Sequence, residues 1–204
     1  MYIPDIYKNE NQEAITAFLK ENSFGILINQ TNGKLWATHI PLQLGTNKNG
    51  KTILEGHISK ENPQWKGFAE NDQILAIFSG PHSYISPSWY DHENVPTWNY
   101  IAVHVYGKIK IIEGDAVIQS LKRLVDKYEK KSKNPVRIED LSKKTMMQTR
   151  GIVAFEIEIE EIQAQQKMSQ NRDDKNYQNI ISELENTNTN QSIAVANEMK
   201  KCPR

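Results

Sequence analysis

Apolar and polar residues alternate with a period of two along much of this chain, which is typical of strands with one buried face. Residues 101–112 are the clearest case, and residues 151–162 alternate in the same way. The predicted buried face of the first segment holds Ile101, Val103, Val105, Ile109 and Ile111. Shorter apolar runs predict four more strands, at 24–28, 34–44, 52–58 and 73–78. These strands lie at hairpin spacings, which predicts an antiparallel barrel.

Other segments have the helical period of three to four residues. They predict helices at 9–21, 61–71, 115–131, 138–149, 173–186 and 191–201, with a long loop at 79–97. The lack of regular alternation between strands and helices argues against a doubly wound parallel sheet, and the predicted class is mainly β with helices, α+β. We expect a single domain over 1–185, with an N-terminal helix at 9–21 and a helical insertion at 115–149. A polar linker and terminal helix follow at 186–204.

From the composition we expect a soluble, cytoplasmic protein. No apolar run approaches the length that spans a bilayer, no export signal is evident, and Cys202 is the single cysteine. Lys plus Arg and Asp plus Glu are both 25, so the chain has no general attraction to nucleic acid or to a membrane. No disulfide framework is possible with one cysteine.

The neutral total hides a basic segment. Residues 122–150 hold 10 basic and 4 acidic residues. We interpret the lysines there as the solvent face of a helix. The alternative is a DNA-contacting surface, although no helix-turn-helix pattern supports it.

Several common catalytic and cofactor motifs are missing from the sequence. No two glycines are separated by a single residue, so the dinucleotide fingerprint is excluded. The Walker phosphate loop, the His-Glu-x-x-His pair and the Gly-x-Ser-x-Gly elbow are also missing. The histidines lack the spacing of paired metal ligands on one helix, so no metal is predicted.

Four segments carry a resemblance to a known family. They are Ala37–Leu42 (ATHIPL), Gly56–Trp65 (GHISKENPQW), Gly80–Tyr90 with its continuation Val95–Tyr100 (VPTWNY), and Lys167–Arg172 (KMSQNR). With the opening MYIP, they resemble the PaiB family of FMN-binding negative transcriptional regulators, over about residues 1–185.

The resemblance implies a split β-barrel, usually a homodimer, that holds FMN at the interface between its subunits. It also implies repression of genes for protease production and sporulation. A second hypothesis is a flavin-dependent oxidoreductase related to pyridoxamine-phosphate oxidases and flavin reductases, with unknown catalytic residues and substrate. A third is a barrel that has lost flavin and binds another small ligand.

Two residues of the second predicted strand are candidates for the flavin edge. Thr38 and His39 precede Pro41, which frees main-chain groups from the strand ladder. They could present a hydroxyl and an imidazole to the ring. The alternatives are an ordinary strand threonine and a barrel-face histidine bonded to a neighbour.

A second group is a candidate for the FMN phosphate. His57, Ser59, Lys60 and Asn62 follow a strand and precede a helix that starts near Pro63. Anions bind at such corners because the first amides of a helix are unpaired. The alternative is that Asn62 only caps the helix and that Lys60 is solvated. Family members often carry Arg at the position of Lys60, so this chain keeps the charge without the bidentate fork.

A third group lies after the last strand. Ser169, Gln170 and Arg172 have no apolar pattern that packing would explain. The resemblance implies that they touch the flavin or substrate of the partner subunit; the alternative is a helix-capping connector. Trp98 is a candidate wall for the flavin ring, together with Tyr84.

Overall fold

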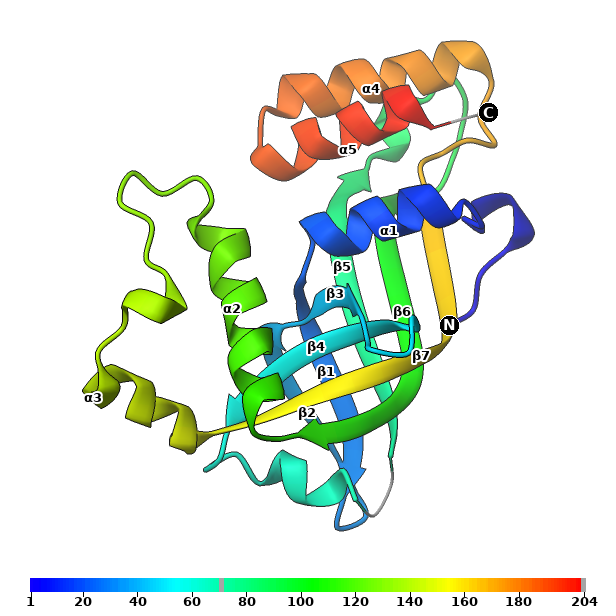
Figure 1. The fold of residues 1–204 in the computed structure, drawn as a ribbon. Coiled ribbons are helices and arrows are strands. Elements are labelled where there is room, and N and C mark those ends of the chain that lie inside the picture. The colour runs from blue at the N-terminus through cyan, green and yellow to red at the C-terminus, as the bar shows by residue number, and fades with distance from the viewer. Residues whose placement is uncertain (70–71, 203–204) are drawn as a thin grey trace. The chain divides into compact units, whose positions relative to one another are not determined.

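The computed structural model describes residues 1–69 and 72–202 (Figure 1). The chain divides into two compact units. The first unit, unit 1, consists of residues 1–18 and 78–104 and of the described residues from 163 to 202. The second, unit 2, consists of residues 19–77 and 105–162. Among the helices of the described residues, none is long and apolar enough to cross a membrane.

An antiparallel sheet of seven strands organises the chain. Its strands are β1 Phe24–Thr31, β2 Lys34–Pro41, β3 Gln43–Thr46, β4 Thr52–Ser59, β5 Gln73–Ile85, β6 Thr97–Ile112 and β7 Ile152–Lys167. Their order is β2-β1-β5-β6-β7-β4-β3, so β2 and β3 are the edges and the sheet is open. The alternation predicted for β6 is confirmed, because Val103, Val105 and Ile109 are buried.

Two of the differences between the predicted and observed strands change the layout of the sheet. The segment 34–44 is two strands, because β2 ends at Pro41 and the Leu42 amide donates to Ser23 O instead of continuing the ladder (2.7 Å). The loop predicted at 79–97 is shorter, because β5 continues to Ile85. The β1–β5 register ends at Ile77, and a proline such as Pro81 is tolerated where a strand has an open side.

Unit 2 buries its core between the strands and holds the helical insertion by polar contacts. Phe68 packs edge-on against Phe155, with ring centroids 5.5 Å apart. Helix α2 (Asp115–Glu129) is fixed by Arg123, whose guanidinium donates twice to the buried Glu55 carboxylate, with Nε to Oε2 at 2.8 Å. Tyr128 of α2 is 52% exposed, and its hydroxyl forms a hydrogen bond with Ser23 Oγ.

The rest of the insertion is short helical turns. They are η4 Ile138–Asp140, α3 Lys143–Met146 and η5 Met147–Gly151, in place of one helix at 138–149. The predicted helix at 61–71 is a 3₁₀ turn, η2, at Pro63–Gly67; residues 70 and 71 lie outside the described residues.

Unit 1 has its own apolar core. It forms where α4 (Asp174–Thr187) and α5 (Asn190–Lys201) pack side by side, as Figure 1 shows in orange and red. The core includes Tyr177, Ile180, Leu184, Val195 and Met199, each at most 2% exposed. Two residues separate the helices, with Asn188 in the left-handed region ending α4 and Thr189 capping α5.

The remaining elements are short turns and the first helix. They are η1 Asp5–Tyr7, η3 Pro87–Trp89 and α1 Gln12–Glu21. The side chain of Asn11 caps α1 by accepting from the Ala14 amide (3.0 Å), which places the start of the helix three residues later than predicted.

Candidate functional site

The corner between β4 and η2 is built on Asn62. Its Oδ1 accepts from the Gln64 amide at 3.0 Å, so it caps η2 as sequence reasoning anticipated. Its Nδ2 donates to Thr38 Oγ1 at 2.9 Å, and the Thr38 hydroxyl donates to Gln64 Oε1. Asn62 and Thr38, predicted separately, therefore meet in one network. The polar atoms of both side chains form hydrogen bonds within the protein, so these residues stabilise the conformation of the corner.

Gln64 is the buried centre of this network, and sequence reasoning missed it. Its side chain is fully buried, and its Nε2 donates to Asn29 Oδ1 (2.9 Å) and to Leu27 O (3.1 Å). These contacts join η2 to β1, while the contact with Thr38 joins it to β2. No pattern in the sequence separates this glutamine from an exposed one, because its partners lie 26 to 37 residues away.

Thr38 and His39 lie on opposite faces of the edge strand β2, as consecutive strand residues must. Thr38 is half-buried on the face that meets η2. His39 is exposed on the other face, with its ring centroid 6.5 Å from that of Phe24. A flat ring lying on one face of β2 would reach one of these two side chains.

The end of β4 presents a hydroxyl and an ammonium group at the surface. Ser59 Oγ accepts from the Glu61 amide (3.2 Å), and no group of the described residues accepts its proton. Lys60 is exposed, and within the described part of the chain no carboxylate pairs with it. His57 is half-buried, and this burial lowers its pKa, so the imidazole is neutral near pH 7. Such a set fits an anion that approaches from solvent.

In unit 1, Ser169 and Gln170 are bonded within the protein. Ser169 is buried with a φ of 58°, and its hydroxyl donates to Asn99 Oδ1 (3.0 Å). Gln170 Oε1 accepts from the Met168 amide, and its Nε2 donates to Gln166 O, both at 2.7 Å. These contacts hold the turn after β7 in a defined shape.

Arg172 and Lys167 bring two positive charges to the same segment. The Arg172 guanidinium lies over the Tyr90 ring, 5.1 Å from its centroid, which is a cation–π geometry. Lys167 donates to Thr97 Oγ1. Burial, and then the charge of Arg172, lower the pKa of Lys167. Two like charges held together favour an anion, so Lys167 joins the residues predicted from sequence.

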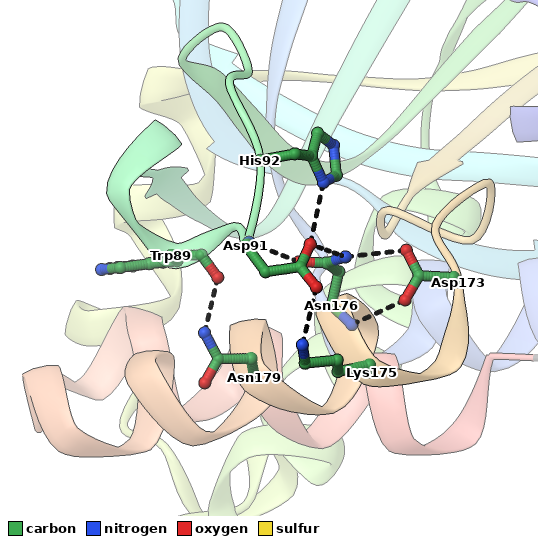
Figure 2. A network of polar contacts seen from close by, with 7 residues as sticks. All are labelled: Trp89, Asp91, His92, Asp173, Lys175, Asn176 and Asn179. Carbon is green, nitrogen blue, oxygen red and sulfur yellow. Dashed lines mark hydrogen bonds and ion pairs between the residues drawn. The ribbon is translucent and has the colours of Figure 1, made fainter.

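A polar network fixes the loop beside Arg172 (Figure 2). The Asp91 carboxylate accepts from Lys175 Nζ at 2.7 Å and from His92 Nδ1 and Asn176 Nδ2 at 2.9 Å. These hydrogen bonds hold the pKa of Asp91 well below its usual range. The Asp173 side chain caps α4 and accepts from the same Asn176 amide group (2.8 Å). The network therefore secures both Tyr90 and Arg172 through their chain neighbours.

Trp98 lies in an exposed aromatic cluster of unit 1. It is 52% exposed, and its ring meets Tyr84 edge-on at 6.0 Å and lies 6.2 Å from the His82 ring. An open indole face of this kind can stack on a flat ligand. Within residues 1–69 and 72–202, no group of three or more His, Cys, Asp or Glu side chains is placed to hold a metal ion.

Comparison with known families gives the decisive observation. Residues 1–161 match the family model described as "Putative FMN-binding domain". The chain belongs to this family. The resemblance drawn from its motifs is thereby confirmed.

A curated bacterial protein is similar to this family member over nearly its whole length. The "Protease synthase and sporulation protein PAI 2" of Bacillus subtilis is 46% identical over 187 residues, which cover 91% of this chain and 90% of that protein. This relative carries the name that the resemblance led us to expect.

Two solved structures share the fold. The flavocytochrome Anf3 of Azotobacter vinelandii has a TM-score of 0.62 at 18% identity, over 87% of this chain and 78% of its own. The FAD and haem binding protein of Mycobacterium smegmatis has a TM-score of 0.61 at 16% identity, and the match covers 79% of this chain and 73% of that protein. They confirm the predicted fold class, an α+β fold of the split-barrel type, although the sheet of this chain is not closed.

Proposed function

We propose that this family member is a cytoplasmic, homodimeric FMN-binding protein that acts as a negative regulator of gene expression. The observation that carries the proposal is the 46% identity to the PAI 2 protein, whose name refers to protease synthesis and sporulation. The family description adds the cofactor. FMN supplies reversible redox chemistry at its ring, so occupancy or redox state would be the signal that the protein senses.

The FMN phosphate is assigned to the end of β4. The Ser59 hydroxyl and the Lys60 ammonium are exposed there and supply a donor and a cation. His57 adds an imidazole on the same strand, and burial lowers its pKa. Asn62 and Thr38 contact each other instead, so their role is to hold η2 in place beneath the phosphate.

The segment after β7 is assigned to the flavin of the partner subunit. Arg172 and Lys167 provide the positive charge, and the buried Ser169 and the internally bonded Gln170 keep the segment in shape. Trp98 and His39 are assigned to the ring itself, because each exposes a flat side chain.

Direct DNA binding through the basic segment 122–150 is not part of the proposal. Two of its basic residues are already neutralised by carboxylates: Lys122 pairs with Glu139, and Arg123 pairs with Glu55. A charge that is neutralised within the protein releases few counterions from DNA. Regulation would then run through a protein or metabolite partner of the flavin-bound dimer.

An FMN titration of the purified chain, followed by quenching of flavin fluorescence, tests the phosphate assignment. Lys60→Ala should weaken FMN binding by about tenfold, the value of one charge-assisted hydrogen bond. Lys66→Ala is the matched control, since Lys66 is also exposed, on η2. Equal affinities of the two variants would refute the assignment. Rapid reduction of the bound flavin by a nicotinamide donor would favour the oxidoreductase hypothesis instead.

A further inference from the structure

A cavity of about 510 Å³ lies entirely within unit 2, beside α2. The helix contributes Ala116, Gln119 and Arg123 to the lining, and residues of β4, β6 and β7 face them. The end of β3 and the turn after it, residues 46–49, complete the lining. A volume of this size is within the range of small-molecule sites, roughly 300 to 1,000 Å³. None of the residues assigned to FMN lines this cavity.

The side chain of Glu156 lies on the cavity side of the sheet. In the register of β4 and β7, Glu156 is directly opposite Glu55, and residues opposite each other share a face of the sheet. The Glu55 carboxylate accepts from Arg123 of α2, so this face is the one that meets the helix. Glu156 is half-buried there, which leaves part of its side chain accessible from the cavity that it lines.

Lys110 of β6 lies on the same face. Every second residue of a strand shares a face, which groups Lys110 with Lys108 on β6, and Glu156 with Glu160 on β7. Lys108 Nζ lies 3.7 Å from Glu160 Oε1, so both groups are on one side of the sheet. Lys110 is exposed and lines the cavity. The cavity therefore has a carboxylate on β7 and an ammonium group on β6.

Neither of these two charges is satisfied within the protein. Among residues 1–69 and 72–202, no cation lies within ion-pair distance of Glu156, and no carboxylate lies within that distance of Lys110. Like charges directly opposite on neighbouring strands are destabilising, and Arg123 neutralises only Glu55. Glu156 therefore favours a cationic group in the cavity, and Lys110 favours an anionic one.

The other charged residues of the lining add no excess of either sign. Glu158 pairs with Lys51, and the exposed residues Lys48 and Glu113 carry one charge of each sign. A ligand with only a negative charge would meet carboxylates, and a ligand with only a positive charge would meet ammonium groups. The lining is therefore matched to a molecule that carries both charges.

Two apolar side chains border the same space. Ile112 is half-buried at the end of β6, on the face of Lys110, and Ala116 is exposed on α2. We propose that this cavity binds a free amino acid with an apolar side chain. Its ammonium group pairs with Glu156, its carboxylate pairs with Lys110, and its side chain packs against Ile112 and Ala116.

Leucine and two of its analogues are matched probes. 3-Methylbutylamine is leucine without the carboxylate, and 4-methylpentanoate is leucine without the ammonium group. Titrations of the full chain, followed by ligand-observed NMR, should give saturable leucine binding with a Kd of about 1 mM or tighter. Each analogue should bind at least about tenfold more weakly, since each lacks one charge-assisted hydrogen bond.

Substitutions on β6 and β7 assign each charge to its partner. Glu156→Gln keeps the size of the side chain and should weaken leucine and 3-methylbutylamine about tenfold, without weakening 4-methylpentanoate. Lys110→Ala should weaken leucine and leave 3-methylbutylamine unchanged. Glu160→Gln and Lys108→Ala are the matched controls, because both residues lie on the same strands and face but outside the lining. Both control variants should bind leucine as the unmodified chain does.

The proposal is overturned if leucine does not bind saturably, which would mean that the charges of the lining are only solvated. It is also overturned if either analogue binds as tightly as leucine, or if Glu156→Gln and Glu160→Gln bind leucine alike. FMN at saturating concentration should leave leucine binding unchanged. Competition between the two would contradict the assignment to a separate site, whereas failure of FMN binding would leave the leucine result standing.

Discussion

Replacement of Gln64 by leucine tests whether the network at the start of η2 holds the corner together. The substitution keeps the side-chain volume and removes every polar contact. The Nε2 group has two hydrogens, and its two shortest contacts are to Asn29 Oδ1 and Leu27 O. Both acceptors lose their donor, and each unsatisfied buried group costs about 1–3 kcal/mol. The Thr38 hydroxyl loses its acceptor as well.

We therefore expect Gln64→Leu to lower the free energy of unfolding by about 3 kcal/mol, because part of the loss is offset by the apolar replacement. Urea denaturation measures the change, with the slope against urea expected to stay constant. Gln30→Leu is the control, since Gln30 is exposed on β1 and should change stability by less than about 0.5 kcal/mol. A loss below about 1 kcal/mol for Gln64→Leu would show that these hydrogen bonds do not hold the corner together.

Four further predictions follow. Because burial lowers the pKa of His57, stability should fall as pH drops below about 6.5, and His57→Gln should reduce that slope in urea titrations. The low pKa of Asp91 should keep its NMR shift constant down to about pH 3, and Asn176→Ala should raise its midpoint. Gly80→Ala would place a Cβ 2.7 Å from Phe18 and should cost about 1–3 kcal/mol, whereas Gly151→Ala meets no atom within 4 Å and should be neutral. Arg172→Ala should weaken FMN binding by about tenfold in a fluorescence titration, with Arg150→Ala as the control.

The strands were predictable where alternation was strong. Successive side chains of β6 and β7 point to opposite faces of the sheet, one buried and one more exposed. Apolar and polar residues therefore alternate in the sequence, and this alternation reveals the strands. The strand ends were not predictable in this way. Pro81 indicates a loop in sequence, and the structure accommodates it because the β1–β5 register ends at Ile77.

The candidate site was predictable only in part. The Asn62 cap is local, because its acceptor and donor lie two residues apart. The contact of Asn62 with Thr38 and those of Asp91 with Asn176 span 24 and 85 residues, and no local pattern encodes them. Gln64 was missed for the same reason, since a buried glutamine and an exposed glutamine look identical in the sequence.

The roles of the predicted residues divide by accessibility. Ser59, Lys60 and His39 are exposed and can meet a ligand directly. The polar groups of Ser169 and Gln170 form hydrogen bonds within the protein. Substitution of either residue should therefore affect FMN binding indirectly, by changing the shape of the segment that carries Arg172. A variant such as Ser169→Ala should therefore lower stability and FMN affinity together.

The visible absorption spectrum of the freshly purified chain tests the central claim, FMN binding, most directly. If the chain binds FMN, its spectrum should show the two visible bands of an oxidised flavin, either at once or after incubation with FMN and removal of the free cofactor by gel filtration. A folded protein that stays colourless after that incubation would contradict this claim.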